Sequence, residues 1–588
     1  MLTVPQSQSS HALSRSVLIA ALILCALAPI AYIVSLIYRF GVNAPVWDEW
    51  ETATLLISAK SGALSLHDLN RQQNEHRLFF PNLIFIGLSE INGWNPKYEM
   101  YGCAFLASLS SIGMCILFRI TSKLPASSVC LAAVLFNLLI FSPIHSETWL
   151  TGLYLTQYLA ELCLIAGVLS MHLPLPPITK ILTCAALCTI GTFSFGHGFN
   201  GWIVLSLLIM FFLHRELKQN YVLPVIWISA FSLNLWFYLR GYQKPIGHPP
   251  LSTCLHAPIQ AIQFFCMLLG SPFGLAFGSA AIWVSTLMGA IILSLFIFLL
   301  GWKILAGVRA KSWEMARSSA GWIAIGLFGL LTAAIITVSR AGFGPLQALE
   351  IRYMQITLPV TLSVCALLFI HAFGARSQGG RTSKYASLLF LSGIAVLMMN
   401  ALPEGIQRMA DLRRSRQRGM AYLEFINIVP CDDILKTSVY PKMAQLRERA
   451  NALDKIGILN PRLIRTSDVT NLALTEGVCE KCGELYKPEY TQDGGVILTG
   501  WAELPYRKEP ADLVLICRQQ KGSTPEVIAL AEVAARPSGN RGAHGHASAH
   551  NWSCMLSNVH FDAEGAISAW AFDCYSYKAM RLSEDSRQ

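Results

Sequence analysis

The sequence predicts an all-α membrane domain that crosses the bilayer about eleven times, followed by a small, mainly β domain. The composition is strongly apolar, because 53% of the 588 residues are hydrophobic, only 14% are charged, and the mean hydropathy is +0.46. Stretches of roughly 20 mostly apolar residues, the length that spans a bilayer as a helix, recur up to residue 402. From residue 403 the composition becomes that of a soluble domain.

The first apolar stretch, 16–40, follows a polar segment, 1–15, which we expect to be cytoplasmic. The stretch is longer than the apolar core of a signal peptide and lacks a small-residue cleavage pattern, so we expect a retained span. Ten further spans complete a multi-span domain at 16–402. They are expected at 98–118, 126–141, 152–171, 178–195, 199–213, 222–239, 281–300, 321–338, 354–372 and 386–402.

The loops between these spans alternate in charge, which predicts their sides of the membrane. Lys and Arg in short loops mark the cytoplasmic side. The basic loops lie at 119–123, 180, 215–218, 303–317 and 376–384. The opposite set is then external and holds the acidic loop 41–97 together with 142–151, 196–198, 240–258 and 339–353.

Two segments complicate this topology. The apolar segment 257–274 is broken by Ser-Pro-Phe-Gly, and counting it as a full span would reverse the side of every later loop. We therefore expect a re-entrant or interfacial helix there. The basic run 413–418 would prefer the cytoplasm, although charges late in a large domain weigh less than charges in short loops.

The tail is expected to contain a helical linker, 403–460, and a β-sandwich-like domain, 461–588. Short alternating patterns at 496–501, 513–517, 527–533 and 567–572 predict strands. The tail also holds six of the sixteen cysteines. An even number on an oxidising membrane face favours disulfides, while the C-x-x-C spacing of Cys479 and Cys482 leaves zinc as an alternative.

The formal net charge of +10 comes mostly from residues that flank spans. Topology and contact with anionic membrane lipids explain this charge better than nucleic-acid binding does. No basic patch with interleaved aromatic residues argues for nucleic acid.

An acidic tetrapeptide, Trp47-Asp48-Glu49-Trp50, follows the first span directly. Carboxylates close to hydrocarbon are costly and are usually retained for function. In that interpretation Asp48 or Glu49 is a general base or helps to hold a divalent cation, Mg²⁺ or Mn²⁺. The alternative is an interfacial loop in which the two tryptophans lie at the level of the lipid headgroups.

The order of these features resembles the GT-C superfamily of membrane glycosyltransferases, such as protein mannosyltransferases and aminoarabinose transferases. Those enzymes carry an acidic pair and an aromatic residue in the first external loop, which Asp48-Glu49-Trp50 matches. A later basic residue followed by prolines is only partly matched, because His76-Arg77 replaces the usual Lys or His before two prolines. Arg352-Tyr353 matches an external Arg-Tyr that opens a late span in several of these families.

The resemblance implies a polyprenyl-phosphate-linked sugar as donor and assigns the residues that would bind it. Arginine suits bidentate contact with a phosphate that leaves as an anion. For each arginine alone, snorkelling to the headgroups is an equal alternative. The expected phosphate-binding residues are His76, Arg77, Arg340, Arg352 and Tyr353, and possible pocket residues are Glu75, His145, Glu147 and His197. A histidine between two glycines, as at 197, is more often structural.

We therefore expect a glycosyltransferase of the inner (plasma) membrane and cell envelope. It would move a sugar to lipopolysaccharide or to another surface glycan, lipid or protein, with its C-terminal domain in the periplasm. The alternatives are a transporter or flippase for lipid-linked saccharides, an O-antigen polymerase or ligase, and a structural assembly protein. Transporters usually show internal repeats and charges within spans, whereas here Glu161 is almost alone. O-antigen enzymes usually depend on a large late external loop.

Overall fold

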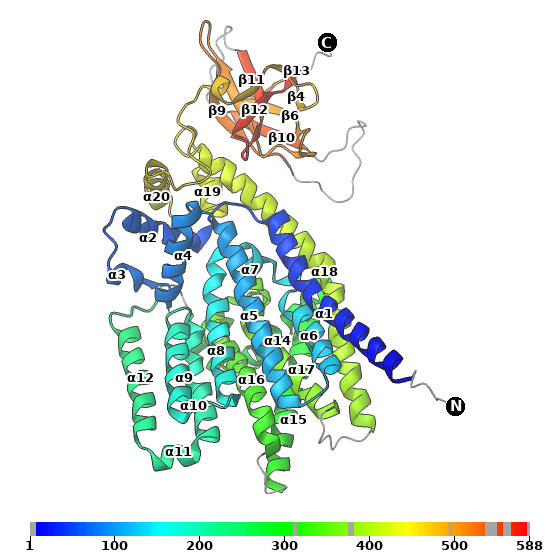
Figure 1. Cartoon of the computed structure of the whole chain (residues 1–588). Helices are drawn as coiled ribbons and strands as arrows, with labels where there is room; N and C mark the ends of the chain where they lie inside the picture. Colours follow the sequence, from blue (N-terminus) through cyan, green and yellow to red (C-terminus); the bar gives the residue numbers. More distant parts are fainter. Residues whose placement is uncertain are drawn as a thin grey trace. The chain divides into compact units, whose positions relative to one another are not determined.

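The computed structural model divides the chain into two compact units (Figure 1). Unit 1 comprises 1–41, 64–85 and 97–410, and unit 2 comprises 42–63, 86–96 and 411–588. The structure describes residues 7–245, 247, 249–250, 252–309, 314–373, 381–492, 495–534, 550–556 and 566–584. Part of the expected cytoplasmic N-terminus, 1–6, and parts of two basic loops, 310–313 and 374–380, lie outside these ranges.

Unit 1 is built from helices. Within the described residues, nine helical segments are long and apolar enough to cross a membrane. The expected multi-pass helical character is therefore confirmed, while two of the eleven expected spans, 178–195 and 199–213, correspond to the shorter helices α9 and α10. The nine segments contain ten main helices, because α14 and α15 together form one segment, 258–309, and α6 reaches the required length together with α7, as 126–150. The ten are α1 (Ser7–Phe40), α5 (Pro96–Ser122), α6 (Ala126–Ile140), α8 (Leu155–His172), α12 (Val222–Leu239), α14 (Pro258–Gly274), α15 (Ala281–Arg309), α16 (Glu314–Arg340), α17 (Ile351–Phe373) and α18 (Arg381–Glu424). Other helices include α3 (Leu66–Leu69), α4 (Phe79–Asn92), α7 (Ser146–Leu150), α9 (Pro177–Thr192), α10 (Asn200–Phe212), α11 (His214–Gln219) and α13 (Ser252–His256).

Helix α17 forms the centre of this unit. In its most apolar stretch, 89% of the residues are buried, compared with 17% in the corresponding stretch of α12. It packs against α14, α15 and α16 and also contacts α6. Residues that begin α17 are therefore held by several neighbouring helices.

Helix α14 lies alongside α15 at very close range. A Cβ atom at Gly289 would meet the Cys266 carbonyl oxygen at 1.7 Å, and one at Gly270 would meet the Ser285 carbonyl oxygen at 2.0 Å. Small residues allow helix backbones to approach in this way. The expected re-entrant or interfacial segment is thus a regular helix packed on α15, and its depth in a membrane stays a prediction.

Unit 2 contains the mainly β region expected at the C-terminal end. Helix α18 runs through Pro403 without interruption, and α19 (Asp432–Ser438) and α20 (Met443–Lys455) follow it. Six strands form one sheet, with β10-β6-β4-β13 in order and β5 and β7 paired to β6, and five strands form a second sheet in the order β3-β12-β11-β8-β9. The strands are β3 (Ala473–Val478), β4 (Gly483–Leu485), β5 (Glu489–Tyr490), β6 (Val496–Leu504), β7 (Glu509–Pro510), β8 (Leu513–Gln519), β9 (Glu526–Ala531), β10 (Asn551–Leu556), β11 (Ala566–Asp573), β12 (Lys578–Arg581) and β13 (Ser583–Glu584).

The two sheets share an apolar core. Leu498 and Ala502 of one sheet pack with Val514, Ile516 and Ala571 of the other, and all five are fully buried. Alternate residues of β6 point into this core, as its burial pattern shows. The four strands expected from the sequence are β6, β8, β9 and β11.

The contact between α14 and α15 makes a testable prediction. Changing Gly289 to Ala should lower stability by about 1–3 kcal/mol, because the added methyl group overpacks the interface. The matched control is Gly301→Ala on the same helix, where an added Cβ meets no atom within 4 Å. Thermal unfolding of the detergent-solubilised protein measures both variants, and equal melting temperatures would contradict the packing described.

Candidate functional site

The acidic tetrapeptide belongs to unit 2, where its two carboxylates have different surroundings. Glu49 is 2% exposed, and its carboxylate accepts a hydrogen bond from the Val46 amide at 2.9 Å. It thereby caps the short helix η1 (Trp47–Glu49). Asp48 is exposed. Of the two predicted catalytic carboxylates, Asp48 is accessible, whereas Glu49 has a capping contact.

The tryptophans beside these acids also differ. Trp50 opens α2 (Trp50–Lys60), is fully buried, and donates from Nε1 to the Pro45 carbonyl at 2.8 Å. Trp47 is 52% exposed and adopts φ +49°, a left-handed conformation that is rare for a bulky side chain. Such backbone outliers persist where the surroundings enforce them and cluster at functional sites. Only Trp47 keeps the exposure that a headgroup anchor needs.

Residues of the tail hold this segment in place. Arg449 donates to the Trp50 carbonyl and to the Glu51 carboxylate, each at 3.0 Å. Tyr440 donates a short hydrogen bond to the same carboxylate. Burial alone would raise the pKa of Glu51, but the hydrogen bonds from Tyr440 and Arg449 outweigh it and lower that pKa. No local pattern pointed to Glu51, because its partners Tyr440 and Arg449 lie in the tail.

The second predicted motif, Glu75-His76-Arg77, lies in unit 1. The Gly196 amide donates to His76 Nδ1 at 3.1 Å, and the imidazole stacks on Phe195 with ring centroids 3.8 Å apart. Burial lowers the pKa of His76 to about 4. The ring is therefore neutral at neutral pH, and because Nδ1 accepts, the proton is on Nε2. Nε2 lies 4.0 Å from the Glu75 carboxylate.

Arg77 makes structural hydrogen bonds. Its guanidinium donates to three backbone carbonyls, those of Tyr238 at 2.8 Å, Asn70 at 2.8 Å and Arg240 at 2.6 Å. The residue is 7% exposed. These contacts tie the first loop to the end of α12, so Arg77 has a structural role at the place where a phosphate ligand was expected.

Arg340, the last residue of α16, lies beside this motif. Its guanidinium pairs with the Glu75 carboxylate at 2.9 Å, and the two side chains are 21% and 31% exposed. The Tyr238 hydroxyl donates to the Glu75 carbonyl at 2.6 Å. The structure thus brings together Glu75, His76 and Arg340 of the predicted set.

A second group surrounds the start of α17. The Arg352 guanidinium lies over the Tyr353 ring, 5.3 Å from its centroid, and 3.9 Å from the Glu350 carboxylate. Its Nε has no hydrogen-bond partner among the described residues, and 42% of the side chain is exposed. Glu147 is close enough to act on Arg352 electrostatically and accepts a hydrogen bond from the Tyr154 hydroxyl at 2.6 Å.

The group around Arg340 and the group around Arg352 lie at the same end of unit 1. Helix α16 ends at Arg340 and α17 begins at Ile351. Only two short 3-10 helices, η6 (Ala341–Phe343) and η7 (Pro345–Leu349), connect them. Two cationic groups with accessible side chains therefore stand at one end of the helical bundle.

The remaining two histidines are packed in the interior. His145 is fully buried. His197 is 6% exposed and contacts the Phe195 and Phe328 rings. Its neighbour Gly198 is required by sterics, since a Cβ there would meet the Gly191 carbonyl oxygen at 2.0 Å. These contacts favour the structural interpretation of the glycine-flanked histidine.

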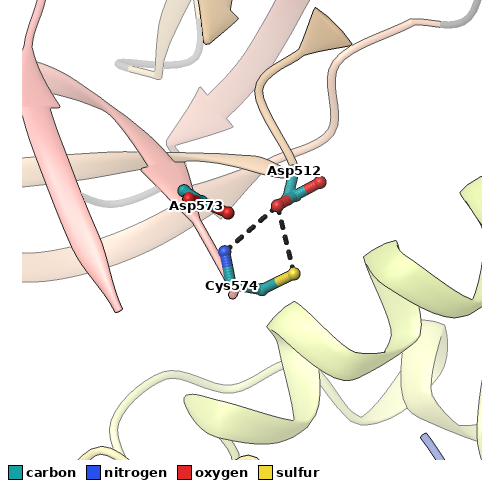
Figure 2. A group of neighbouring side chains, drawn as sticks. All are labelled: Asp512, Asp573 and Cys574. Atoms are coloured by element: carbon teal, nitrogen blue, oxygen red, sulfur yellow. Dashed lines mark hydrogen bonds between the residues drawn. The ribbon is translucent and has the colours of Figure 1, made fainter. Parts of the chain in front are cut away.

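Sequence reasoning did not find the acidic cluster of the β domain. Asp512, Asp573 and Cys574 offer ligand atoms within 4.8 Å of one another and are all buried (Figure 2). The Cys574 thiol donates to Asp512 at 3.0 Å, and its backbone amide donates to the same oxygen at 3.1 Å. Burial and the neighbouring Asp512 carboxylate raise the pKa of this thiol well above its usual range.

Arg507 already neutralises this cluster. Its NH1 group lies 2.7 Å from both aspartates. The other Asp573 oxygen accepts from the Tyr506 hydroxyl at 2.6 Å and from the Ser576 hydroxyl at 2.7 Å. The residues therefore form a structural network of ion pairs and hydrogen bonds.

The cysteine pair of the tail forms a bond. Cys479 and Cys482 are joined as a disulfide, so they are not zinc ligands. The other described tail cysteines, Cys431, Cys517, Cys554 and Cys574, are free thiols. The expectation of structural disulfides holds for this one pair.

Comparisons with known proteins were made at three levels. Neither the protein-family models, nor the curated proteins, nor the solved structures contain a match to this chain. The assignment of function therefore rests on the residues described above.

The environment of His76 predicts a pH effect on stability. Its pKa of about 4 lies below the ordinary value of 6.5, so folding favours the neutral ring. The stabilisation is complete above pH 6.5 and is lost as the pH falls through 4, by up to about 3 kcal/mol. In His76→Asn, whose amide oxygen replaces Nδ1 as acceptor, melting temperature should fall less between pH 7 and pH 4. An equal fall in melting temperature between pH 7 and pH 4 in the two proteins would contradict the buried, neutral state of His76.

Proposed function

We propose that this chain is a membrane glycosyltransferase that uses a polyprenyl-phosphate-linked sugar as donor. The observation that carries the proposal is Arg352 at the start of the central helix. Its side chain is 42% exposed, its nearest carboxylate lies 3.9 Å away, and its Nε is without a hydrogen bond in the described part of the chain. A partly exposed guanidinium beside an aromatic ring suits a lipid phosphate.

Arg340 supports the same role from the adjacent helix. Its contact with Glu75 holds it at the end of α16, and the neutral His76 beside it offers an Nε2–H donor. Two cations at one end of the bundle would stabilise the negative charge that develops on the leaving phosphate. Arg77 is not assigned to the phosphate, because three backbone carbonyls occupy its guanidinium.

In the proposed reaction, an acceptor hydroxyl attacks the anomeric carbon of the sugar and the polyprenyl phosphate leaves as an anion. Asp48 takes the hydroxyl proton as general base. Glu49 holds the turn through its contact with the Val46 amide. The acceptor would be lipopolysaccharide or another surface glycan, lipid or protein on the external face of the plasma membrane, with the β domain outside.

Transport of a lipid-linked saccharide is the second candidate function. A specific observation favours it: Glu161 is a buried carboxyl within a span, and ionisable residues at such positions commonly serve transport.

Removing the charge of Asp48 tests the proposed chemistry. Asp48→Asn keeps the shape of the side chain, so expression and membrane insertion should be normal while transfer falls at least about 100-fold, as expected for loss of a general base. Mass spectrometry of surface glycans and polyprenyl-linked sugars, in a deletion strain carrying either form, measures the effect. Full complementation by the variant would reject the glycosyltransferase assignment.

Exchanging Arg352 for Lys tests donor binding. A point charge cannot reproduce the planar fork, and loss of a charged hydrogen bond costs about 1.5–3 kcal/mol. The KM for the donor should therefore rise about tenfold or more. Arg240→Lys is the matched control, because Arg240 lies at the end of α12 over Trp236 and only its backbone contacts Arg77. An unchanged KM in Arg352→Lys would make Arg352 an anchor instead of a ligand.

A further inference from the structure

Glu161 is a carboxyl group placed within the helical bundle. It lies about 9 Å along α8 from the first residue of that helix. It is 7% exposed, and α8 belongs to a segment long and apolar enough to span a membrane. A carboxylate at such a position carries a large desolvation cost unless it is paired or protonated.

Among the described residues, Glu161 has one hydrogen-bond partner, and that partner is neutral. The Gln355 amide donates from Nε2 to Glu161 Oε2 at 3.1 Å. Glu161 Oε1 and Gln355 Oε1 are both buried and have no hydrogen-bond partner among the described residues. These two buried acceptor oxygens each lack a hydrogen, and a proton on Glu161 would supply one.

Glu161 and Gln355 both line a small cavity. It measures about 20 Å³, which is room for about one water molecule. Its polar lining consists of Ser110, Tyr158, Glu161 and Gln355. A buried water needs two to four polar partners, and this wall provides them.

Apart from Glu161 itself, the described residues that line the cavity include no Asp, Glu, Lys, Arg or His. On α8 itself the titratable neighbour is Tyr158, whose hydroxyl lies 3.3 Å from the Thr148 hydroxyl. Helix α5 contributes Ser110 to the cavity, and its Cys103 acts on Tyr158. The remaining lining is apolar or neutral: Ala107 and Met114 of α5, Ile140 of α6, Leu164 and Ile165 of α8, Ile325 of α16, and Gln355, Leu358, Pro359 and Leu362 of α17.

We propose that Glu161, Gln355 and the adjoining cavity form a proton-binding site in the core of the membrane unit. The resting form is the carboxylic acid. On release, the O–H bond at Glu161 breaks, the proton passes to the cavity water, and the carboxylate keeps one hydrogen bond from Gln355. An anion with a single donor requires more water or a shift between α8 and α17, so proton binding is coupled to the packing of the central helix.

The cavity suits a proton better than a metal cation. Sodium or a divalent cation needs several oxygen ligands around a space large enough for the ion. Only two orphaned acceptor oxygens are present among the described lining residues, and most of the wall is apolar. This site is independent of the proposed glycosyl transfer, so either can fail without the other.

Infrared difference spectroscopy of the full-length protein in lipid nanodiscs tests the site. At neutral pH the spectrum of the wild type minus that of Glu161→Gln should contain the C=O band of an un-ionised carboxyl that shifts in D₂O, because the substitution removes this carboxyl while keeping the contact with residue 355. Gln355→Leu removes the donor to the carboxylate, so the pH at which the band disappears should rise. A purely structural role of Gln355 would leave the pH at which the band disappears unchanged.

Three outcomes would overturn the proposal. The first is a wild-type spectrum without the band at neutral pH, and the second is the same band in Glu161→Gln. The third is a band lost on replacing choline chloride with sodium chloride at constant pH, which would assign the site to a metal cation.

Discussion

The ion pair between Glu51 and Arg449 is the contact on which the arrangement of unit 2 depends. It joins residues 398 positions apart, with a 3.0 Å contact between them. The same arginine holds the Trp50 carbonyl, while the Trp50 ring packs edge-on against Trp94, with centroids 5.5 Å apart. Residues 42–63 and 86–96 therefore fold with the tail. The turn that carries Asp48 takes its conformation from residues far away in the sequence.

The hydrogen-bond partners of each arginine separate structural from functional candidates. Arg77 satisfies three backbone carbonyls and is 7% exposed, so its removal would leave buried acceptors unpaired. Among the described residues, Arg352 has no comparable set of hydrogen-bond partners, and its side chain is 42% exposed. Both were equal candidates in the sequence, because charge and position relative to a span do not reveal where a guanidinium points.

Local patterns predicted the elements but not their long-range partners. Apolar length predicted the helices, and alternation predicted β6, β8, β9 and β11, because both signals are carried by neighbouring residues. The change in composition at Pro403 did not end a helix, since α18 continues to Glu424. The basic run 413–418 had no visible partner in the sequence, yet Arg413 lies 3.4 Å from Glu509 and Arg418 lies 3.2 Å from Glu532. These glutamates balance part of the positive charge of the run, so anionic lipids are not needed to account for it.

The carboxyl groups show the same dependence on partners. Glu49 is satisfied by a backbone amide, and Asp573 accepts from Arg507, Tyr506, Ser576 and the Tyr575 amide. Such filled acceptors are stable and chemically inert, because a reacting proton or ligand would have to displace existing bonds. Asp48 keeps an exposed side chain, and in the described part of the chain one oxygen of Glu161, a residue that lines a cavity, has no hydrogen-bond partner. The proposed proton transfers are therefore assigned to these two acids, one at a surface turn and one within the helical bundle.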